Sequence, residues 1–381
     1  MTSAERREAR YQRRVIARQA RKDANRIKYD NYDELFTYRR LYSSYRCCRH
    51  GVSWKASVQK YITNAPLNIY QTYRRLKAGT YRSPGFFEFD LFERGKKRHI
   101  RSTVIGERIV QRTLCDHALI PALQRTFIYD NGATMKHKGY DFAIRRITEH
   151  LRQHYREHGN EGYILLFDFS KFFDNVSHEL VKKDIRKNIT DERIIAITEH
   201  LIDMFGEKGM GLGSQISQVL ALASGNKLDH YVKEVLRIKR YGRYMDDGYL
   251  IHHDKKYLQT CLVQIKRICD ELGIVLNIKK THIFKLSRGF SWLKARIYLT
   301  KSGKIVKKIY KRSITRQRRK MKKLKKKWKS GKVRLRWIFD SFRSWKGYAL
   351  KFSAWHTVQN MLKLYNILYL NTEEESYHDL C

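Results

Sequence analysis

The tetrapeptide Tyr244-Met245-Asp246-Asp247 decides the fold of this chain of 381 residues. It lies between two short runs, at 240–243 and 248–251, that contain tyrosine and other residues favoured in strands, so it predicts the tip of a β-hairpin. Two adjacent carboxylates repel each other, and a divalent cation would neutralise them. Because aspartate is also an ordinary turn residue, the tetrapeptide alone is equally compatible with a solvated turn.

A second carboxylate follows an uninterrupted apolar run. Residues 163–167 are apolar, and Asp168 comes directly after them, ahead of residues typical of a turn and a helix cap. This pattern predicts a buried strand with Asp168 at its carboxyl end. A buried carboxylate is costly, and the cost disappears if Asp168 meets Asp246 and Asp247 across neighbouring strands and the three bind two Mg²⁺ ions. The alternative is a partly exposed aspartate at a strand end.

Three motifs in this order resemble those of reverse transcriptases: the apolar run with Asp168, a glycine-containing turn at 211–218, and the hairpin with Asp246 and Asp247. The resemblance spans residues 73–298. It implies an α+β right-hand polymerase of fingers, palm and thumb, with an antiparallel palm sheet and a helical, basic thumb. Leu212-Gly213 and Ser217-Gln218 stand where most members have Gln-Gly and Ser-Pro. This variant resembles the bacterial branch of diversity-generating retroelements, near the group II intron enzymes.

The resemblance also implies the roles of the catalytic residues. The carboxylates of Asp168 and Asp246 and the backbone carbonyl of Phe169 would bind two Mg²⁺ ions, or Mn²⁺ in their place, and Asp247 would assist. Lys280 best fits the position of a lysine that protonates the leaving pyrophosphate, and Lys279 is the second choice. In so basic a protein an ordinary surface lysine is a strong alternative for Lys280.

Further positions match family contacts to the incoming nucleotide. Alternating aromatic and acidic residues followed by a basic turn predict a β-hairpin over residues 86–101. The resemblance implies that its cations contact the triphosphate, although each cation could instead be a solvated turn charge. Phe173 matches an aromatic gate that excludes a 2′-hydroxyl, with a core residue as its alternative. Leu212 replaces a polar contact to the nucleotide sugar, so we expect relaxed fidelity. The complete set of predicted nucleotide contacts is Lys97, Arg98, Arg101, Phe169, Phe173, Leu212, Gly213 and Gln218.

Composition indicates a polyanionic partner. The chain has 80 Lys and Arg against 37 Asp and Glu, a formal net charge of +43, and nucleic acid is the default partner for such a surface. An anionic membrane is less well supported, because no apolar stretch approaches the ~20 residues of a spanning helix. The six cysteines show no paired spacing typical of zinc sites, and scattered thiols favour a cytoplasmic location.

Two segments predict basic helices. Thr2 and Glu5 form a capping box for a helix through about residue 26, whose arginines and lysines occupy nearly every face. It could lie on phosphates or on an acidic partner, or be a frayed terminus. Residues 304–336 carry an apolar stripe inside a cationic tract, which predicts a thumb helix against a duplex. The stripe is Ile314, Met321, Leu324 and Trp328.

These observations predict four regions: a basic helical extension at 1–60, fingers at 61–160, palm at 161–299, and a helical thumb with a loose acidic tail at 300–381. The expected activity is RNA-directed DNA polymerisation alone, with RNA as template, DNA or RNA as primer and deoxynucleoside triphosphates as substrates, in the service of a retroelement. Two alternatives stay open. One is a template-independent or protein-primed enzyme of anti-phage defence, and the other is an inactive RNA-binding relative. An accessory protein or a second copy of the chain could assist.

Overall fold

The computed structural model describes residues 2–93 and 95–370, so the predicted acidic tail at 373–375 lies outside the described residues. The chain divides into two compact units. The first comprises residues 1–143, 167–248 and 261–278, and the second comprises 144–166, 249–260 and 279–381. None of the helices in the described residues has the length and hydrophobicity of a membrane span.

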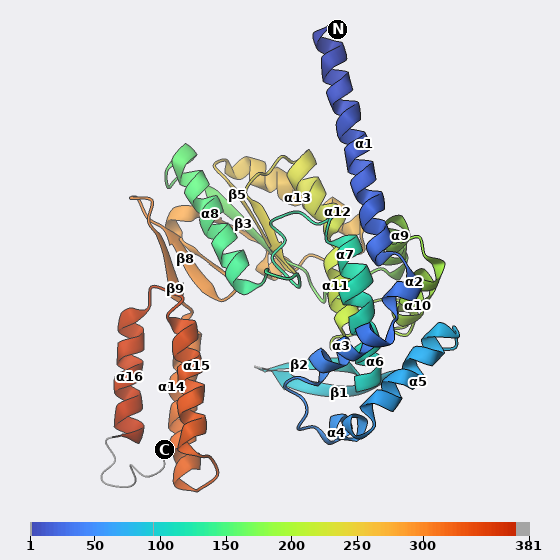
Figure 1. The fold of residues 1–381 in the computed structure, drawn as a ribbon. Coiled ribbons are helices and arrows are strands. Elements are labelled where there is room, and N and C mark those ends of the chain that lie inside the picture. The colour runs from blue at the N-terminus through green and yellow to red at the C-terminus, as the bar shows by residue number, and fades with distance from the viewer. Residues whose placement is uncertain (1, 94, 371–381) are drawn as a thin grey trace. The chain divides into compact units, whose positions relative to one another are not determined.

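The first unit begins with the predicted basic helix, α1 (Ser3–Tyr29), and both halves of its predicted capping box are present. The short helices α2 (Tyr32–Leu35), α3 (Tyr38–Arg49), α4 (Ala56–Thr63) and α5 (Ala65–Lys77) follow (Figure 1). Helix α4 ends at Thr63, and Pro66 lies in the first turn of α5. A proline is tolerated there because its missing N–H would have no partner in the helix.

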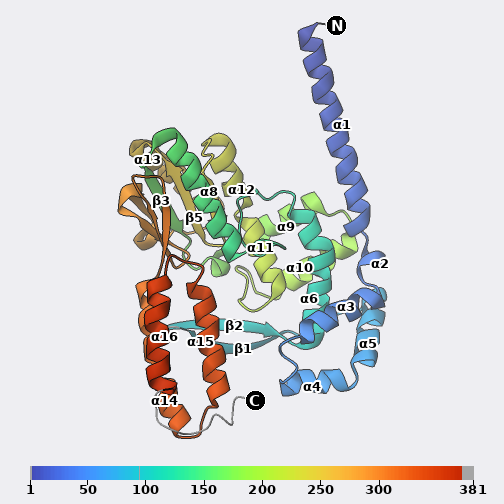
Figure 2. The same cartoon turned by 60° about the vertical axis from the view of Figure 1, so that its left-hand side comes forward.

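A two-stranded hairpin follows, as predicted from its alternating residues. Strands β1 (Phe86–Glu93) and β2 (Lys96–Thr103) pair in antiparallel register from Phe86 opposite Thr103 to Glu93 opposite Lys96. Helix α6 (Ile105–Leu114) continues through a π-helical turn (Cys115–Leu119) into α7 (Ile120–Leu123). Helix α6 packs against α3, and both views show the two helices side by side (Figures 1 and 2).

Four strands form the palm sheet, in the order β4-β5-β3-β6. They are β3 (Tyr163–Asp168), β4 (Tyr241–Tyr244), β5 (Asp247–His252) and β6 (His282–Lys285). Strand β3 is buried along most of its length, as its apolar run predicts, and pairs antiparallel with β6. The first unit also contains four helices: α9 (His178–Asn188), α10 (Glu192–Asp203), α11 (Gln215–Ser224) and α12 (Asn226–His230). Helix α8 (Tyr140–His158) and helix α13 (Lys255–Glu271) each contribute to both units.

The second unit ends in a small sheet and three helices. Strands β7 (Phe290–Trp292), β8 (Ala295–Leu299) and β9 (Ile305–Ile309) form an antiparallel meander. Helices α14 (Lys311–Lys329), α15 (Leu335–Ala349) and α16 (Trp355–Tyr369) then pack together (Figure 2). In the predicted stripe of α14, Met321 and Leu324 are buried, and the Tyr369 hydroxyl donates to the Met321 carbonyl at 2.6 Å. The apolar stripe therefore forms this core while the cations face outward.

Candidate active site

The structure brings Asp168 next to Asp246. Asp168 is the last residue of β3, and Asp246 lies in the turn between β4 and β5. The main-chain N–H of Phe169, the residue after Asp168, donates to the Asp246 carbonyl oxygen at 3.0 Å. Asp168 is 5% exposed, and Asp246 and Asp247 are half-buried. The two acidic motifs, far apart in sequence, therefore meet at one end of the sheet.

Phe167 and Gly248 show how closely these strands approach. The Phe167 ring packs over Gly248 so tightly that a Cβ at this glycine would overlap the ring. Phe167 immediately precedes Asp168, and Gly248 immediately follows Asp247. Only a residue without a side chain lets the acidic ends of β3 and β5 approach to this distance.

Asn277 fixes the other side of Asp168. Its main-chain N–H donates to the Asp168 carbonyl at 2.8 Å, and its side-chain amide donates to the Asp168 carboxylate at 3.2 Å. Asn277 precedes a 3₁₀ turn (Ile278–Lys280) that contains exposed Lys280. Asn277 was not predicted as a site residue. Its position three residues before the predicted catalytic lysine was the available signal.

The tip of the acidic hairpin has an unusual backbone. Met245 has φ +54°, in the left-handed region that few side chains other than glycine and asparagine adopt readily. The Nη1 of Arg243 donates to the Met245 carbonyl at 2.8 Å. Arg243 therefore contacts the peptide that leads directly into Asp246.

Arg243 forms a fully buried ion pair with Asp229 of α12. Its Nε and Nη2 donate to the two carboxylate oxygens at 2.8 and 2.7 Å, and both side chains are 0% exposed. The Tyr241 hydroxyl donates to the same carboxylate at 2.6 Å. Burial lowers the pKa of Arg243, but attraction to Asp229 outweighs it, so the net pKa lies above its usual value. The bidentate geometry and the extra donors satisfy both charges.

Gly225, between α11 and α12, leaves room for this guanidinium group. A Cβ at Gly225 would lie 2.7 Å from the Arg243 Cζ. The Arg243 Nη2 also donates to the Leu222 carbonyl of α11 at 3.0 Å. One buried arginine thus connects the acidic hairpin to two helices of the first unit.

The predicted triphosphate contacts lie on the β1-β2 hairpin, where acids of the same hairpin pair with them. Lys97 Nζ lies 2.9 Å from Asp90, and Arg101 Nε lies 3.0 Å from Glu88. Arg98 Nε is 3.7 Å from Glu93. Such exposed pairs contribute little to stability, so a triphosphate could replace the carboxylates at small cost.

The glycine turn packs on Arg101, and this close contact requires residues without a side chain. The Arg101 main-chain N–H donates to the Leu212 carbonyl at 2.8 Å. Gly213 has φ +122°, and a Cβ there would lie 2.8 Å from the Arg101 carbonyl oxygen. The close neighbour of the turn in the structure is therefore strand β2.

The remaining predicted contacts differ in exposure. Phe172 is buried, whereas Phe173 is half-buried in a 3₁₀ turn (Phe173–Asn175). Gln218 is exposed, while neighbouring Ser217 is buried and bonds through its hydroxyl to Ser214 at 2.7 Å. Phe173 and Gln218 can thus reach a ligand, and Ser217 instead stabilises the start of α11.

The carboxylate oxygens of Asp168 and Asp246 are the kind of ligand that suits Mg²⁺. Within residues 2–93 and 95–370, no three His, Cys, Asp or Glu side chains form a ready-made metal cluster. Mg²⁺ usually keeps several waters and binds through one or two carboxylates and substrate phosphates, rather than in an all-protein cage. The oxygen donors of Asp168 and Asp246, held by the Phe169 contact at 3.0 Å, fit this mode of binding.

Comparisons with solved structures find telomerases. The telomerase from Candida albicans in complex with a TWJ fragment of telomeric RNA shares 11% identity, with a TM-score of 0.47, over 79% of this chain and 62% of that one. The apo telomerase from Candida tropicalis shares 13% identity, with a TM-score of 0.46, over 62% of this chain and 51% of that one. The chain thus spans less than two thirds of the length of either. A comparison with curated protein sequences gives no match.

Residues 93–329 match the family model described as reverse transcriptase (RNA-dependent DNA polymerase). This match covers more than half of the chain and includes the glycine turn and both acidic motifs. It confirms the predicted polymerase domain, and the mixed helices and antiparallel sheets agree with the predicted α+β right-hand fold. The chain therefore belongs to the reverse transcriptase family.

Proposed function

We propose that the protein is an RNA-directed DNA polymerase that extends a DNA or RNA primer along an RNA template with deoxynucleoside triphosphates. The contact between Phe169 and Asp246 carries this proposal, because it joins the two acidic motifs at one place. The primer 3′-hydroxyl attacks the α-phosphate of the nucleotide, a new phosphodiester bond forms, and pyrophosphate leaves. Exposed Lys280 donates a proton to that leaving group.

Asp168, Asp246 and the Phe169 carbonyl would hold two Mg²⁺ ions, with Asp247 beside them. Bound there with the substrate phosphates, the ions would stabilise the attacking and leaving oxygens. The protein's own contribution is to keep the carboxylates in place. Asn277 does so for Asp168 through two hydrogen bonds, and Arg243 does so for the turn before Asp246.

The nucleotide contacts follow from the same assignment. Lys97, Arg98 and Arg101 exchange their carboxylate partners for the triphosphate. Half-buried Phe173 excludes a 2′-hydroxyl, and Leu212 withholds a polar contact to the sugar, which relaxes fidelity. Gly213 and Gln218 complete the nucleotide side of the site. A Phe173→Ala variant should then incorporate more ribonucleotide, and an unchanged preference for deoxynucleotides would argue against the gate.

The regions keep their predicted roles in this proposal: extension at 1–60, fingers at 61–160, palm at 161–299 and thumb with tail at 300–381. The departures at Leu212 and at Ser217-Gln218 favour a retroelement enzyme of the diversity-generating branch. The role in anti-phage defence is the second candidate, and the genes that neighbour this one would separate the two.

The decisive experiment is primer extension. The purified chain is incubated with a primed RNA, Mg²⁺ and deoxynucleotides, beside an Asp246→Ala variant and a variant of an exposed lysine, Lys266→Ala, as a surface control. We expect product from wild type and from Lys266→Ala, and none from Asp246→Ala. Equal product from wild type and Asp246→Ala would remove the assigned active site, and no product from a folded wild type would favour the inactive RNA-binding alternative.

A further inference from the structure

Helix α1 is strongly cationic and almost completely exposed. It contains eight arginines and two lysines against three acidic residues. At about 100° per residue, Arg6, Arg10, Arg13 and Arg14 share one side of the helix; we call these four residues the arginine face. Glu5, Glu8 and Asp23 lie on the opposite side. The charges of this helix are therefore segregated.

The charges of the arginine face are available to a ligand. All four side chains are exposed. Arg10 and Arg13 donate to main-chain carbonyls of their own helix, and no ion pair within the described residues engages Arg6, Arg10, Arg13 or Arg14. Cations that stabilise their own helix form ion pairs with acids three or four residues away.

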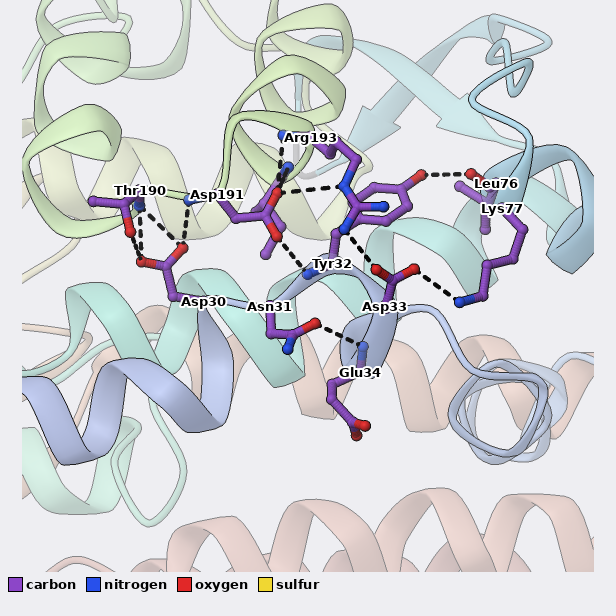
Figure 3. A network of polar contacts seen from close by, with 11 residues as sticks. Asp30, Asn31, Tyr32, Asp33, Glu34, Leu76, Lys77, Thr190, Asp191 and Arg193 are labelled. Carbon is purple, nitrogen blue, oxygen red and sulfur yellow. Dashed lines mark hydrogen bonds and ion pairs between the residues drawn. The ribbon is translucent and has the colours of Figure 1, made fainter.

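A polar network fixes the end of α1 in the first unit (Figure 3). The Asp30 carboxylate accepts from the main-chain N–H groups of Thr190 and Asp191, each at 2.8 Å, at the start of α10. The Asp191 carboxylate in turn accepts from the Tyr32 N–H at 2.7 Å. Asp33 bridges Lys77 at 2.8 Å and Arg193 at 2.7 Å. Helix α1 is therefore anchored by its last turn, and its direction is set.

A hollow of about 340 Å³ lies at this anchored base. Lys28, Arg40 and Arg125 line it and supply positive charge. Asp116, also in the lining, is already bound by Arg112 at 3.1 Å and by Gln215 at 2.6 Å. Burial and the nearby Arg40 lower the pKa of His117, so the positive charge of the hollow comes from the other three cations.

We propose that the arginine face of α1, with the hollow at its base, binds the phosphate backbone of a folded RNA other than the primer-template duplex. This goes beyond the proposed polymerase activity, because it assigns a second RNA contact. Arginine forks match phosphate geometry, and arginine makes up eight of the ten cations of α1. A membrane-surface helix would carry an apolar face opposite its cations, whereas α1 carries acids there.

Two variants with the same change in net charge test this surface. Arg10→Gln with Arg14→Gln removes two charges from the arginine face. Ile16→Glu with Ile27→Glu adds two negative charges on the other side, at positions that are 67% and 76% exposed. Binding of the full chain to an RNA hairpin is measured across a salt titration, with a short primed template present in excess to occupy the polymerase site.

We expect the arginine pair to lower the slope of log affinity against log salt by about two, because each lost phosphate contact removes about one. The isoleucine pair should change the slope by less than about half a unit. Equal effects of the two pairs, or no effect of the arginine pair, would overturn the proposal. Displacement of the hairpin by polyglutamate as readily as by unlabelled RNA would also overturn the proposal. Phosphatidylserine vesicles that compete with the hairpin for binding would overturn it as well.

Primer extension on the short template separates this inference from the proposed function. The arginine pair should extend at the wild-type rate, since α1 contributes nothing to the acidic site. Failure of wild type to extend would contradict the polymerase proposal and leave the hairpin-binding result standing.

Discussion

Arg243 and the arginine face of α1 use the same side chain for two different purposes. Arg243 is 0% exposed and bound to Asp229, Met245 and Leu222, so its charge holds the surrounding structure in place. Arg10 and its neighbours are exposed, so their charge stays available to a polyanion. Burial and bound partners, rather than residue type, therefore decide whether an arginine stabilises a site or binds a ligand.

The largest expected effect comes from breaking the buried pair. Arg243→Ala leaves Asp229 buried without its partner, which should lower the free energy of unfolding by about 3–5 kcal/mol. Urea denaturation measures this change. The acidic hairpin also loses the donor to Met245, so primer extension should fall sharply. A folded Arg243→Ala protein that extends primers at the wild-type rate would contradict the positioning role.

A double substitution sharpens the same point. Arg243→Met with Asp229→Leu replaces the pair by apolar groups of similar volume, which is often neutral for stability. We expect stability about 1–3 kcal/mol below wild type, because the buried Tyr241 hydroxyl loses its acceptor, but no recovery of primer extension, because the Met245 carbonyl lacks its donor. Recovery of both would show that the pair serves stability alone.

A substitution at Gly225, which packs against Arg243, should have a smaller effect on stability. Gly225→Ala places a methyl group 2.7 Å from the Arg243 guanidinium carbon, and such overpacking costs about 1–3 kcal/mol. Gly347 of α15 is the matched control, since nothing lies within 4 Å of its Cβ position. Gly347→Ala should stabilise the helix by up to about 1 kcal/mol. Thermal or urea unfolding of both variants checks the difference in sign.

Asp30→Ala tests the polar network that anchors α1 and its arginine face. The Asp30 side chain is 1% exposed, and its loss leaves the N–H groups of Thr190 and Asp191 without their acceptor, at a cost of about 1–2 kcal/mol. The substitution also removes a negative charge. If charge alone governed hairpin-RNA binding, affinity would rise, whereas a role for the direction of α1 predicts that it falls. Asn31→Ala, which removes only the cap of the short helix α2, is the control.

The smallest effect is a pH dependence in the same network. Hydrogen bonds from Arg193 and then Lys77 lower the pKa of Asp33 from 3.8 to about 2. A lowered pKa stabilises the fold above the unfolded-state value and loses that contribution as pH falls toward the folded-state value. Asp33→Asn should therefore be less stable than wild type at neutral pH, and the gap should close between about pH 4 and pH 2. A gap that stays constant across this range, measured by urea midpoints, would contradict the pairing.

Local patterns in the sequence predicted much of this fold. Alternation predicted β1 and β2, and the capping box predicted the start of α1. These features depend on neighbours within a few residues or on a hairpin register, so periodicity and capping chemistry are sufficient. The family resemblance then placed Asp168 and Asp246 at one site, and the contact through Phe169 agrees with it.

The supporting contacts were not predicted, because they depend on packing between distant elements. Asp229 lies among Asn226, Lys227 and His230 in α12, so its local sequence indicated neither burial nor a pairing with Arg243. The close approach of Gly211 and Gly213 to strand β2 was not predicted either. The same holds for Ser217, which is buried and bonded to Ser214.

Metal binding tests the central claim most directly. Mn²⁺ can be followed by electron paramagnetic resonance in a complex of the protein with primed RNA, a chain-terminated primer and the next nucleotide. If Asp168 and Asp246 act as one site, wild type should bind Mn²⁺ in this complex, and Asp168→Asn and Asp246→Asn should each lose that binding. Undiminished Mn²⁺ binding by either folded variant would contradict the account.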